Sequence, residues 1–214
     1  MQTLFVTATG TNIGKTYTTI ELIGAFSDQG ISVGVCKPIE TGVDDIPVDA
    51  KILLEACGVH NPAFASLSPT DITAYTFSLP AAPFSADTNQ TIEIEKILEK
   101  IDELSQYCDL LIIEGAGGLM VPITRDFMMI DLIQALDTKV LLVTPSRLGS
   151  INDTLLSIEA LTSREIDFDW CVNLFEDRES FDEVTKPFYD ALYPEWWSVE
   201  GGLEQYVEFL RCTP

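Results

Sequence analysis

A loop rich in threonine and glycine follows the first apolar run of the chain and ends in Gly14-Lys15-Thr16. The apolar run, Leu4-Phe5-Val6, is typical of a strand, and the segment from Tyr17 to Phe26 is compatible with a helix. Between a strand and a helix, consecutive backbone N–H groups can bind phosphates, a lysine adds positive charge and a hydroxyl can bind Mg²⁺. These residues predict a P-loop that binds a nucleoside triphosphate.

The spacing of this loop departs from the usual pattern, G-x-x-x-x-G-K-[ST]. The pattern places its first glycine at position 9, where this chain has Thr9. The alternative is a chance Gly-Lys-Thr between a strand and a helix. The strand–loop–helix setting favours the P-loop.

An acidic residue, Glu114, directly follows the apolar run Leu110 to Ile113 and precedes Gly115-Ala116-Gly117-Gly118. A carboxylate at the carboxyl end of a buried strand can be the second magnesium contact of a P-loop protein. The glycines allow the backbone to approach a ligand closely. The alternative is an ordinary glycine turn after a strand, but beside a P-loop Glu114 is our candidate metal ligand.

Lys37 follows another apolar run, Val33 to Cys36, and no basic residue other than Lys15 and Lys37 occurs before Lys51. A lysine at the end of a buried strand is expected to point into the ligand crevice. Two lysines at one site suit the charge that develops on a transferring phosphoryl group. The alternative is a side chain that extends to solvent.

Asp49 and His60 are two further polar residues that could be functional. Asp49 could contact a metal ion, but its spacing fits the N-cap of a helix equally well. His60 is the only histidine and lies in a turn-like stretch, Gly58 to Pro62, so we expect it to be an exposed turn residue without a catalytic role.

Apolar runs alternate with segments of helical periodicity along the chain. Apolar residues on both faces are typical of buried parallel strands. The predicted strands are Leu4–Val6, Val33–Cys36, Leu110–Ile113, Val140–Val143 and Trp170–Val172. Helical periodicity is clearest over residues 94–104 and 151–161. The order predicts one α/β domain over residues 1–214, a P-loop NTPase-like, mostly parallel sheet with helices on both faces and ligands at the carboxyl ends of its strands.

The stretch from Asn61 to Thr91 interrupts this alternation and is rich in proline. We interpret it as a long ordered loop with room for one short helix. A loop of this length is expected to be functional or to form an interface.

The net charge of −22 would repel nucleic acid and anionic membranes. Five cysteines, an odd number without a C-x-x-C pair, favour reduced thiols. The chain begins without a basic leader, and no apolar run approaches the roughly 20 residues that span a bilayer. We therefore expect a cytoplasmic protein with small-molecule substrates and neither nucleic-acid nor membrane partners.

Over most of its length the chain resembles the dethiobiotin synthetases. The matching segments are Gly14-Lys15-Thr16, Lys37-Pro38-Ile39-Glu40-Thr41-Gly42, Tyr75-Thr76-Phe77 with Pro80 and Pro83, Glu114 to Ile123, and Leu148-Gly149-Ser150-Ile151-Asn152. The resemblance implies that CO2 carboxylates 7,8-diaminopelargonic acid to a carbamate, that ATP phosphorylates this carbamate, and that the second amine closes the cyclic urea. ADP and phosphate are released, and the product, dethiobiotin, is an intermediate of biotin synthesis.

The resemblance also implies a role for individual residues. Lys37, Lys15 and Thr11 are the implied catalytic residues, and Thr16, Asp49 and Glu114 are the implied ligands of Mg²⁺. Nucleotide contacts are implied for Asn12, Ile13, Gly14, Lys15, Thr16, Tyr17, Asp49, Glu114, Gly115, Ala116, Gly117 and Asn173. Substrate contacts are implied for Thr41 and for Gly149, Ser150, Ile151 and Asn152. These last four begin a helix that would receive the substrate carboxylate from the neighbouring subunit of a homodimer.

Several positions depart from the family pattern. Ala8-Thr9-Gly10-Thr11 replaces the usual start of the loop, Asn12 replaces an acidic residue, and Phe84 and Asp153 replace histidines. The segment that walls the adenine is not recognisable in Tyr193 to Trp197. The sequence therefore gives no basis for assuming a strict preference for ATP.

Three other functions compete with this interpretation. A partition or septum-positioning ATPase would carry a signature lysine where this chain has Gly10. A small-molecule kinase would close an arginine-bearing lid over the phosphates, but the five arginines do not cluster. A non-catalytic nucleotide-binding module is the third alternative.

Overall fold

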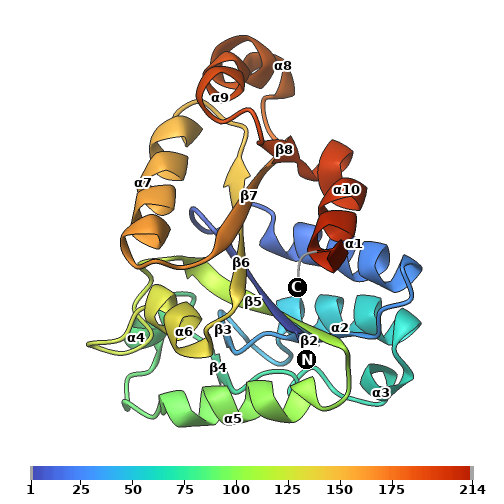
Figure 1. Cartoon of the computed structure of the whole chain (residues 1–214). Coiled ribbons are helices and arrows are strands. Elements are labelled where there is room, and N and C mark those ends of the chain that lie inside the picture. Colours follow the sequence, from blue (N-terminus) through green and yellow to red (C-terminus); the bar gives the residue numbers. More distant parts are fainter. Residues whose placement is uncertain (1, 213–214) are drawn as a thin grey trace.

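A computed structural model describes residues 2–212 and contains a six-stranded sheet in the order β2-β5-β1-β6-β7-β8 (Figure 1). All neighbouring strands of this sheet pair in parallel. Its strands are β1 (Gln2–Ala8), β2 (Val33–Cys36), β5 (Leu110–Gly118), β6 (Lys139–Pro145), β7 (Phe168–Asn173) and β8 (Trp197–Ser198). The five predicted strands are confirmed, whereas β8 was not predicted because two residues carry no periodicity.

Helices cover both faces of the sheet. The longer ones are α1 (Lys15–Asp28), α2 (Val48–His60), α5 (Ile94–Ser105), α6 (Met129–Leu136), α7 (Ser150–Ser163) and α10 (Val199–Cys212). Helices α1 and α10 lie on one side of the sheet, and α6 and α7 lie on the other (Figure 1). In α5, the residues at helical spacing, Ile97, Ile101 and Leu104, are the buried ones. The predicted fold class is therefore confirmed.

The central strands are apolar along their length because both of their faces are covered. In β1, Phe5 and Val6 are fully buried, and Phe5 lies between Ile113 of β5 and Val140 of β6. The buried apolar side chains form one continuous cluster. Within residues 2–212, no helix is long and apolar enough to cross a membrane.

The segment from Asn61 to Thr91 contains more regular structure than predicted, since only one short helix was expected there. It holds two short helices, α3 (Pro62–Ala65) and α4 (Pro83–Ala86), and a strand, β4 (Tyr75–Phe77). Strand β4 pairs in parallel with β3 (Ile39–Thr41) in a separate two-stranded sheet. Both helices start at a proline, which is favoured at the first helical position.

The expectation that His60 lies in a turn was wrong in one respect. His60 is the last residue of α2, not part of a turn, although it is exposed as expected. Gly58 precedes it inside the helix, where it lies against the backbone of Ala65. Close packing between α2 and α3 therefore explains a glycine that resembles a turn signal in the sequence.

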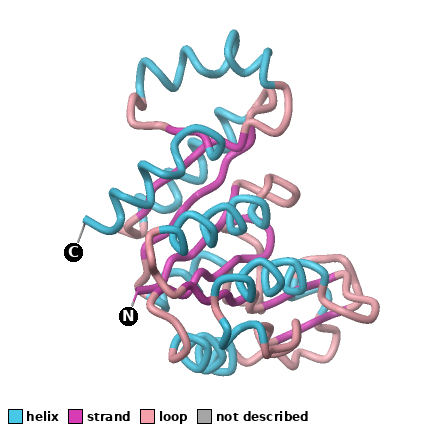
Figure 2. The backbone as a smooth tube through the Cα atoms, turned by 90° about the vertical axis from the view of Figure 1, so that its right-hand side faces the viewer, coloured by secondary structure: helices cyan, strands magenta, loops and turns pink. Residues whose placement is uncertain are grey.

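The last part of the chain extends the sheet at its β7–β8 end (Figure 2). It contains α8 (Arg178–Ser180), a π-helical turn, η1 (Phe181–Thr185), and α9 (Lys186–Leu192). Tyr189 is fully buried there, with its ring edge-on to Trp170 at a centroid distance of 5.0 Å. Aromatic packing holds this end of the chain against β7.

Candidate active site

The P-loop joins the end of β1 to the start of α1, and its last residue before the helix needs to be glycine. Gly14 has φ = 101°, in the left-handed region. A Cβ at Gly14 would also lie 2.0 Å from Nδ2 of Asn173. That nitrogen donates a hydrogen bond to the carbonyl of Ile13 at 2.9 Å, so the end of β7 is packed directly on the loop.

Lys15 is buried, with 7% of its surface exposed, and its Nζ donates to the carbonyl of Gly10 at 3.0 Å. The lysine thus folds back across the loop, where phosphates bind in P-loop proteins. Burial, with the charge of Lys37 as the next cause, lowers the pKa of Lys15 to about 8. An anionic phosphate at this position would favour the charged form of the lysine.

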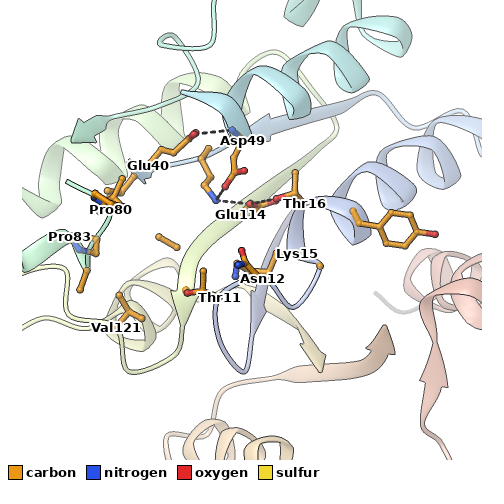
Figure 3. A pocket seen from close by; sticks show the side chains of 18 of the residues that line it. Thr11, Asn12, Lys15, Thr16, Glu40, Asp49, Pro80, Pro83, Glu114 and Val121 are labelled. Atoms are coloured by element: carbon orange, nitrogen blue, oxygen red, sulfur yellow. Dashed lines mark hydrogen bonds and ion pairs between the residues drawn. The ribbon is translucent and has the colours of Figure 1, made fainter. Parts of the chain in front are cut away.

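Four side chains from four segments meet beside the loop (Figure 3). Nζ of Lys37 lies 2.6 Å from Oε1 of Glu114 and 3.0 Å from a carboxylate oxygen of Asp49. The hydroxyl of Thr16 donates to the same Oε1 at 3.1 Å. These side chains converge because β2 and β5 are parallel and end at the same edge as the P-loop.

Lys37 and Glu114 are both buried, with 3% and 0% of their surfaces exposed. Burial alone disfavours the charged lysine, but the carboxylates of Glu114 and Asp49 outweigh it and raise the pKa of Lys37 above its usual range. Oε2 of Glu114 is buried and has no hydrogen-bond partner among the described residues. A buried, unpaired carboxylate oxygen is an acceptor available to a cation or a donor.

These residues line a cavity of about 920 Å³ that extends from the P-loop to α4. Figure 3 shows Pro80, Pro83 and Val121 on the side of the cavity away from Lys15 and Thr16. The cavity is large enough for a nucleotide together with a small second substrate.

Most of the predicted site residues line this cavity. They are Thr11, Asn12, Gly14, Lys15, Thr16, Tyr17, Lys37, Thr41, Asp49, Glu114, Ala116, Gly117 and Asn173. Ile13 and Gly115 are not among the lining residues: Ile13 is buried, and Gly115 packs against the ring of Phe5. The start of α7, residues 149–152, is also outside the lining, and its predicted role in a partner's site stays a prediction.

The two interpretations of Asp49 can be separated in part. Asp49 does not cap its helix, because the N-cap position of α2 is Pro47. Its side chain instead contacts Lys37 and is 44% exposed, on the cavity side. This geometry leaves the carboxylate available for a metal ion.

Glu40, Phe175 and Glu200 are among the lining residues that had no predicted role. Glu40 accepts backbone hydrogen bonds at the start of α2, and Phe175 and Glu200 lie at the Asn173 end of the cavity. Glu200 is the second residue of α10, and Phe175 follows β7 in an irregular segment. Neither has a spacing signal that links it to the P-loop, whereas Glu40 lies inside a segment already singled out for Lys37.

Among residues 2–212, no cluster of three or more histidine, cysteine, aspartate or glutamate side chains could hold a metal ion by itself. Two carboxylates and one hydroxyl do meet, at Asp49, Glu114 and Thr16. Mg²⁺ at nucleotide sites uses one or two carboxylates and completes its coordination with phosphates and water. The donor set and the unpaired Oε2 of Glu114 fit such an ion.

Two solved structures share this fold at low sequence identity. The chain resembles the MinC:MinD cell division complex of Aquifex aeolicus with a TM-score of 0.55 and 18% identity, covering 98% of this chain and 86% of that one. A plasmid partition protein from Borrelia burgdorferi gives a TM-score of 0.59 at 8% identity, covering 98% and 97%. At these identities the likeness shows the fold alone.

Sequence relatives are more specific. A family model described as an AAA domain matches residues 2–169. The ATP-dependent dethiobiotin synthetase BioD of Sulfurovum sp. (strain NBC37-1) is 65% identical over 210 residues, covering 98% of this chain and 100% of the relative. The enzyme of the same name from Wolinella succinogenes is 34% identical over 213 residues, covering 98% of both. The chain therefore belongs to the family of ATP-dependent dethiobiotin synthetases.

Proposed function

We propose that the cavity between the P-loop and Lys37 is where this enzyme closes the ring of dethiobiotin. The enzyme is an ATP-dependent ligase that forms carbon–nitrogen bonds from 7,8-diaminopelargonic acid and CO2, in biotin biosynthesis. One observation carries the assignment of the site: the buried Nζ of Lys37 lies 2.6 Å from Glu114 and shares a cavity with Lys15 and Thr16 of the P-loop.

Lys37 and Lys15 supply the positive charge that phosphoryl transfer requires. The carbamate is an anion, and its attack on the terminal phosphate of ATP brings two negatively charged groups together. Lys37 is proposed to bind the carbamate and the transferring phosphoryl group, while Lys15 and Thr11 contact the phosphates of the nucleotide. Fixed charges in a buried site stabilise such a transition state more than they would in water.

Asp49, Glu114 and Thr16 are proposed to hold Mg²⁺ with the phosphates. When bound, the ion neutralises charge on the phosphate oxygens. Both carboxylates contact Lys37, so binding of a nucleotide with its cation would exchange partners within the site. Lys37 would then be free to contact the phosphoryl group.

Each end of the cavity suits one substrate. Asn173 is proposed to contact the base, because its Oδ1 is buried and has no hydrogen-bond partner among the described residues. Thr41 lines the cavity, directly before Gly42, which packs on Pro80, and is proposed to contact the diamine. The diamine's carboxylate would bind at residues 149–152 of a second subunit, in a cytoplasmic homodimer.

The function is tested by incubating the protein with ATP, Mg²⁺, labelled bicarbonate and the diamine, and by measuring label in a cyclic urea. The expected result is labelled dethiobiotin and a phosphate release that requires both the diamine and bicarbonate. Phosphate release that proceeds equally well without the diamine would instead support an ATPase switch. The same assay with GTP and CTP measures how strictly the enzyme prefers ATP.

A further inference from the structure

Glu40 connects the strand after Lys37 to the start of α2. Its carboxylate accepts two backbone hydrogen bonds, each at 2.9 Å: Oε1 from the N–H of Asp49 and Oε2 from the N–H of Ala50. Figure 3 shows the contact with Asp49. Only 7% of the Glu40 surface is exposed. The contact therefore joins β3 to a helix that begins several residues later in the chain.

The first backbone N–H groups of helix α2 need a hydrogen-bond acceptor from another segment of the chain. The first backbone N–H groups of a helix have no partner within it, and a side chain at the N-cap usually accepts from them. Here the N-cap residue is Pro47, which has no side-chain acceptor. Glu40 supplies both acceptors, and its negative charge is favourable at a helix N-terminus.

The capped residue is also a residue of the proposed metal site. The backbone N–H of Asp49 donates to Glu40, and the Asp49 carboxylate lies 3.0 Å from Nζ of Lys37. The Asp49 side chain is 44% exposed, so little side-chain packing fixes its position. The hydrogen bond from the Asp49 backbone to Glu40 therefore fixes the position of the residue that carries this carboxylate.

We propose that Glu40 is a positioning residue, which holds the start of α2 so that the Asp49 carboxylate meets Lys37 and the nucleotide-bound cation. This inference rests on the proposed function of the site. Glu40 acts through Asp49, and its loss is expected to weaken cation binding more than nucleotide or diamine binding. A role in helix capping alone would change stability without changing cation binding.

The test measures Mn²⁺ binding by electron paramagnetic resonance in the presence of a non-hydrolysable ATP analogue. Residues that orient metal ligands typically change metal affinity by about 10–100-fold. Glu40→Ala, which removes both acceptors, is expected to weaken Mn²⁺ binding by at least about tenfold. Glu40→Gln keeps one acceptor and is expected to lie between Glu40→Ala and the wild type. The KM for the diamine is expected to stay unchanged in both.

Asp87 offers a matched control. It is 6% exposed, its Oδ2 accepts from the backbone N–H groups of Thr91 and Ile92, and it does not line the cavity. Asp87→Ala should therefore lower the melting temperature and leave Mn²⁺ binding unchanged.

Two results would overturn the proposal: wild-type Mn²⁺ binding in Glu40→Ala, or an equal loss of Mn²⁺ binding in Asp87→Ala. The cyclic-urea assay of the wild-type enzyme distinguishes failure of the Glu40 proposal from failure of the proposed function. If it forms no labelled cyclic urea, the proposed function fails; if it does and Glu40→Ala binds Mn²⁺ normally, only the positioning role fails.

Discussion

Two carboxylates hold the buried Lys37. A substitution of Lys37 therefore affects the stability of the fold as well as catalysis. Removing one partner of a buried ion pair leaves the other charge uncompensated, which costs about 3–5 kcal/mol. Lys37→Ala would leave Glu114, which is fully buried, without its closest partner. A substitution that keeps a donor for Glu114 is therefore the better probe of catalysis.

Lys37→Gln is expected to lower kcat by about 10²–10³-fold, the usual effect of removing one group that stabilises transition-state charge. Nucleotide affinity should change little, because Lys15 and the loop backbone are intact. Single-turnover assays with labelled bicarbonate and calorimetric titration with ATP measure the two effects. Lys51→Gln, at an exposed lysine, is the control. Near-normal turnover of Lys37→Gln would remove this lysine from the mechanism.

At the residue scale, the sequence predicted side chains that follow strands. Lys37 and Glu114 each come directly after an apolar run, so strand order alone brings them to one edge of the sheet. Glu40 and Asp49 could not be assigned in this way. Their contact depends on the conformation of the loop between β3 and α2. That loop has no regular pattern of apolar residues from which its conformation could be predicted.

At the scale of elements, the P-loop is held between α1 and the end of β7. Gly14 lies where both the left-handed backbone and the nearby Asn173 amide exclude a side chain. A loop fixed in this way presents its N–H groups without reorganisation when the phosphates bind. The contact also joins Asn173, the proposed base contact, to the P-loop.

Gly14→Ala is expected to weaken nucleotide binding strongly. A left-handed non-glycine residue costs about 1–2 kcal/mol, and the added methyl group must also displace Asn173. Gly24→Ala, inside α1, is the control, because a Cβ added at Gly24 would meet no other atom within 4 Å. It should stabilise the protein by about 0.5–1 kcal/mol, as removal of a helical glycine does. Equal nucleotide affinity in both variants would contradict this view of the loop.

Helix α6 provides a pH-dependent contribution to stability. Burial tends to raise the pKa of Asp131, but the N–H of Met128, at 2.6 Å, and the guanidinium of Arg164 lower it below its ordinary 3.8. A lowered pKa stabilises the fold above the unfolded-state value, and this contribution is lost as the pH falls through the folded-state value. Asp131→Asn should therefore have a lower melting temperature at pH 7, with the difference shrinking below about pH 3.8. A difference that is independent of pH would show that the charge is not responsible.

The sequence predicted the five longer strands, but among the long helices it missed α2 and α10. The five strands were predicted as apolar runs, α1 from its place after the P-loop, and α5 and α7 from helical periodicity. In α7 only Leu161 of the apolar residues at that spacing is buried. The short strands β3, β4 and β8 were not predicted, since two or three residues cannot show alternation. They form through contacts between distant segments, as in the pairing of Ile39 with Tyr75.

At the scale of the whole molecule, proteins that share this fold differ in function. The sheet is shared with cell division and plasmid partition proteins that have little sequence in common with this chain. Sequence relatives at 65% and 34% identity place it instead among the dethiobiotin synthetases. Because unrelated functions share this architecture, the function has to be argued from the side chains of the site, such as Lys37.

The predicted homodimer has a consequence for α7. Leu148 is 71% exposed and Asn152 is exposed, so the start of α7 is open at the surface of a single chain. If it serves a partner's site, Asn152→Glu should repel the diamine carboxylate in that partner and not in its own subunit. Asn152→Gln, which adds no charge, is expected to remain active.

Mixed dimers of Lys37→Gln and Asn152→Glu subunits distinguish the two arrangements. With sharing between subunits, one site of the mixed dimer combines the intact Lys37 of one subunit with the intact α7 of the other, while the second site carries both changes. The mixed dimer, purified through two different affinity tags, should then recover about half of the wild-type rate. Without sharing, every site carries one change and no activity returns. Recovery of activity therefore measures directly whether α7 completes the active site of the partner subunit.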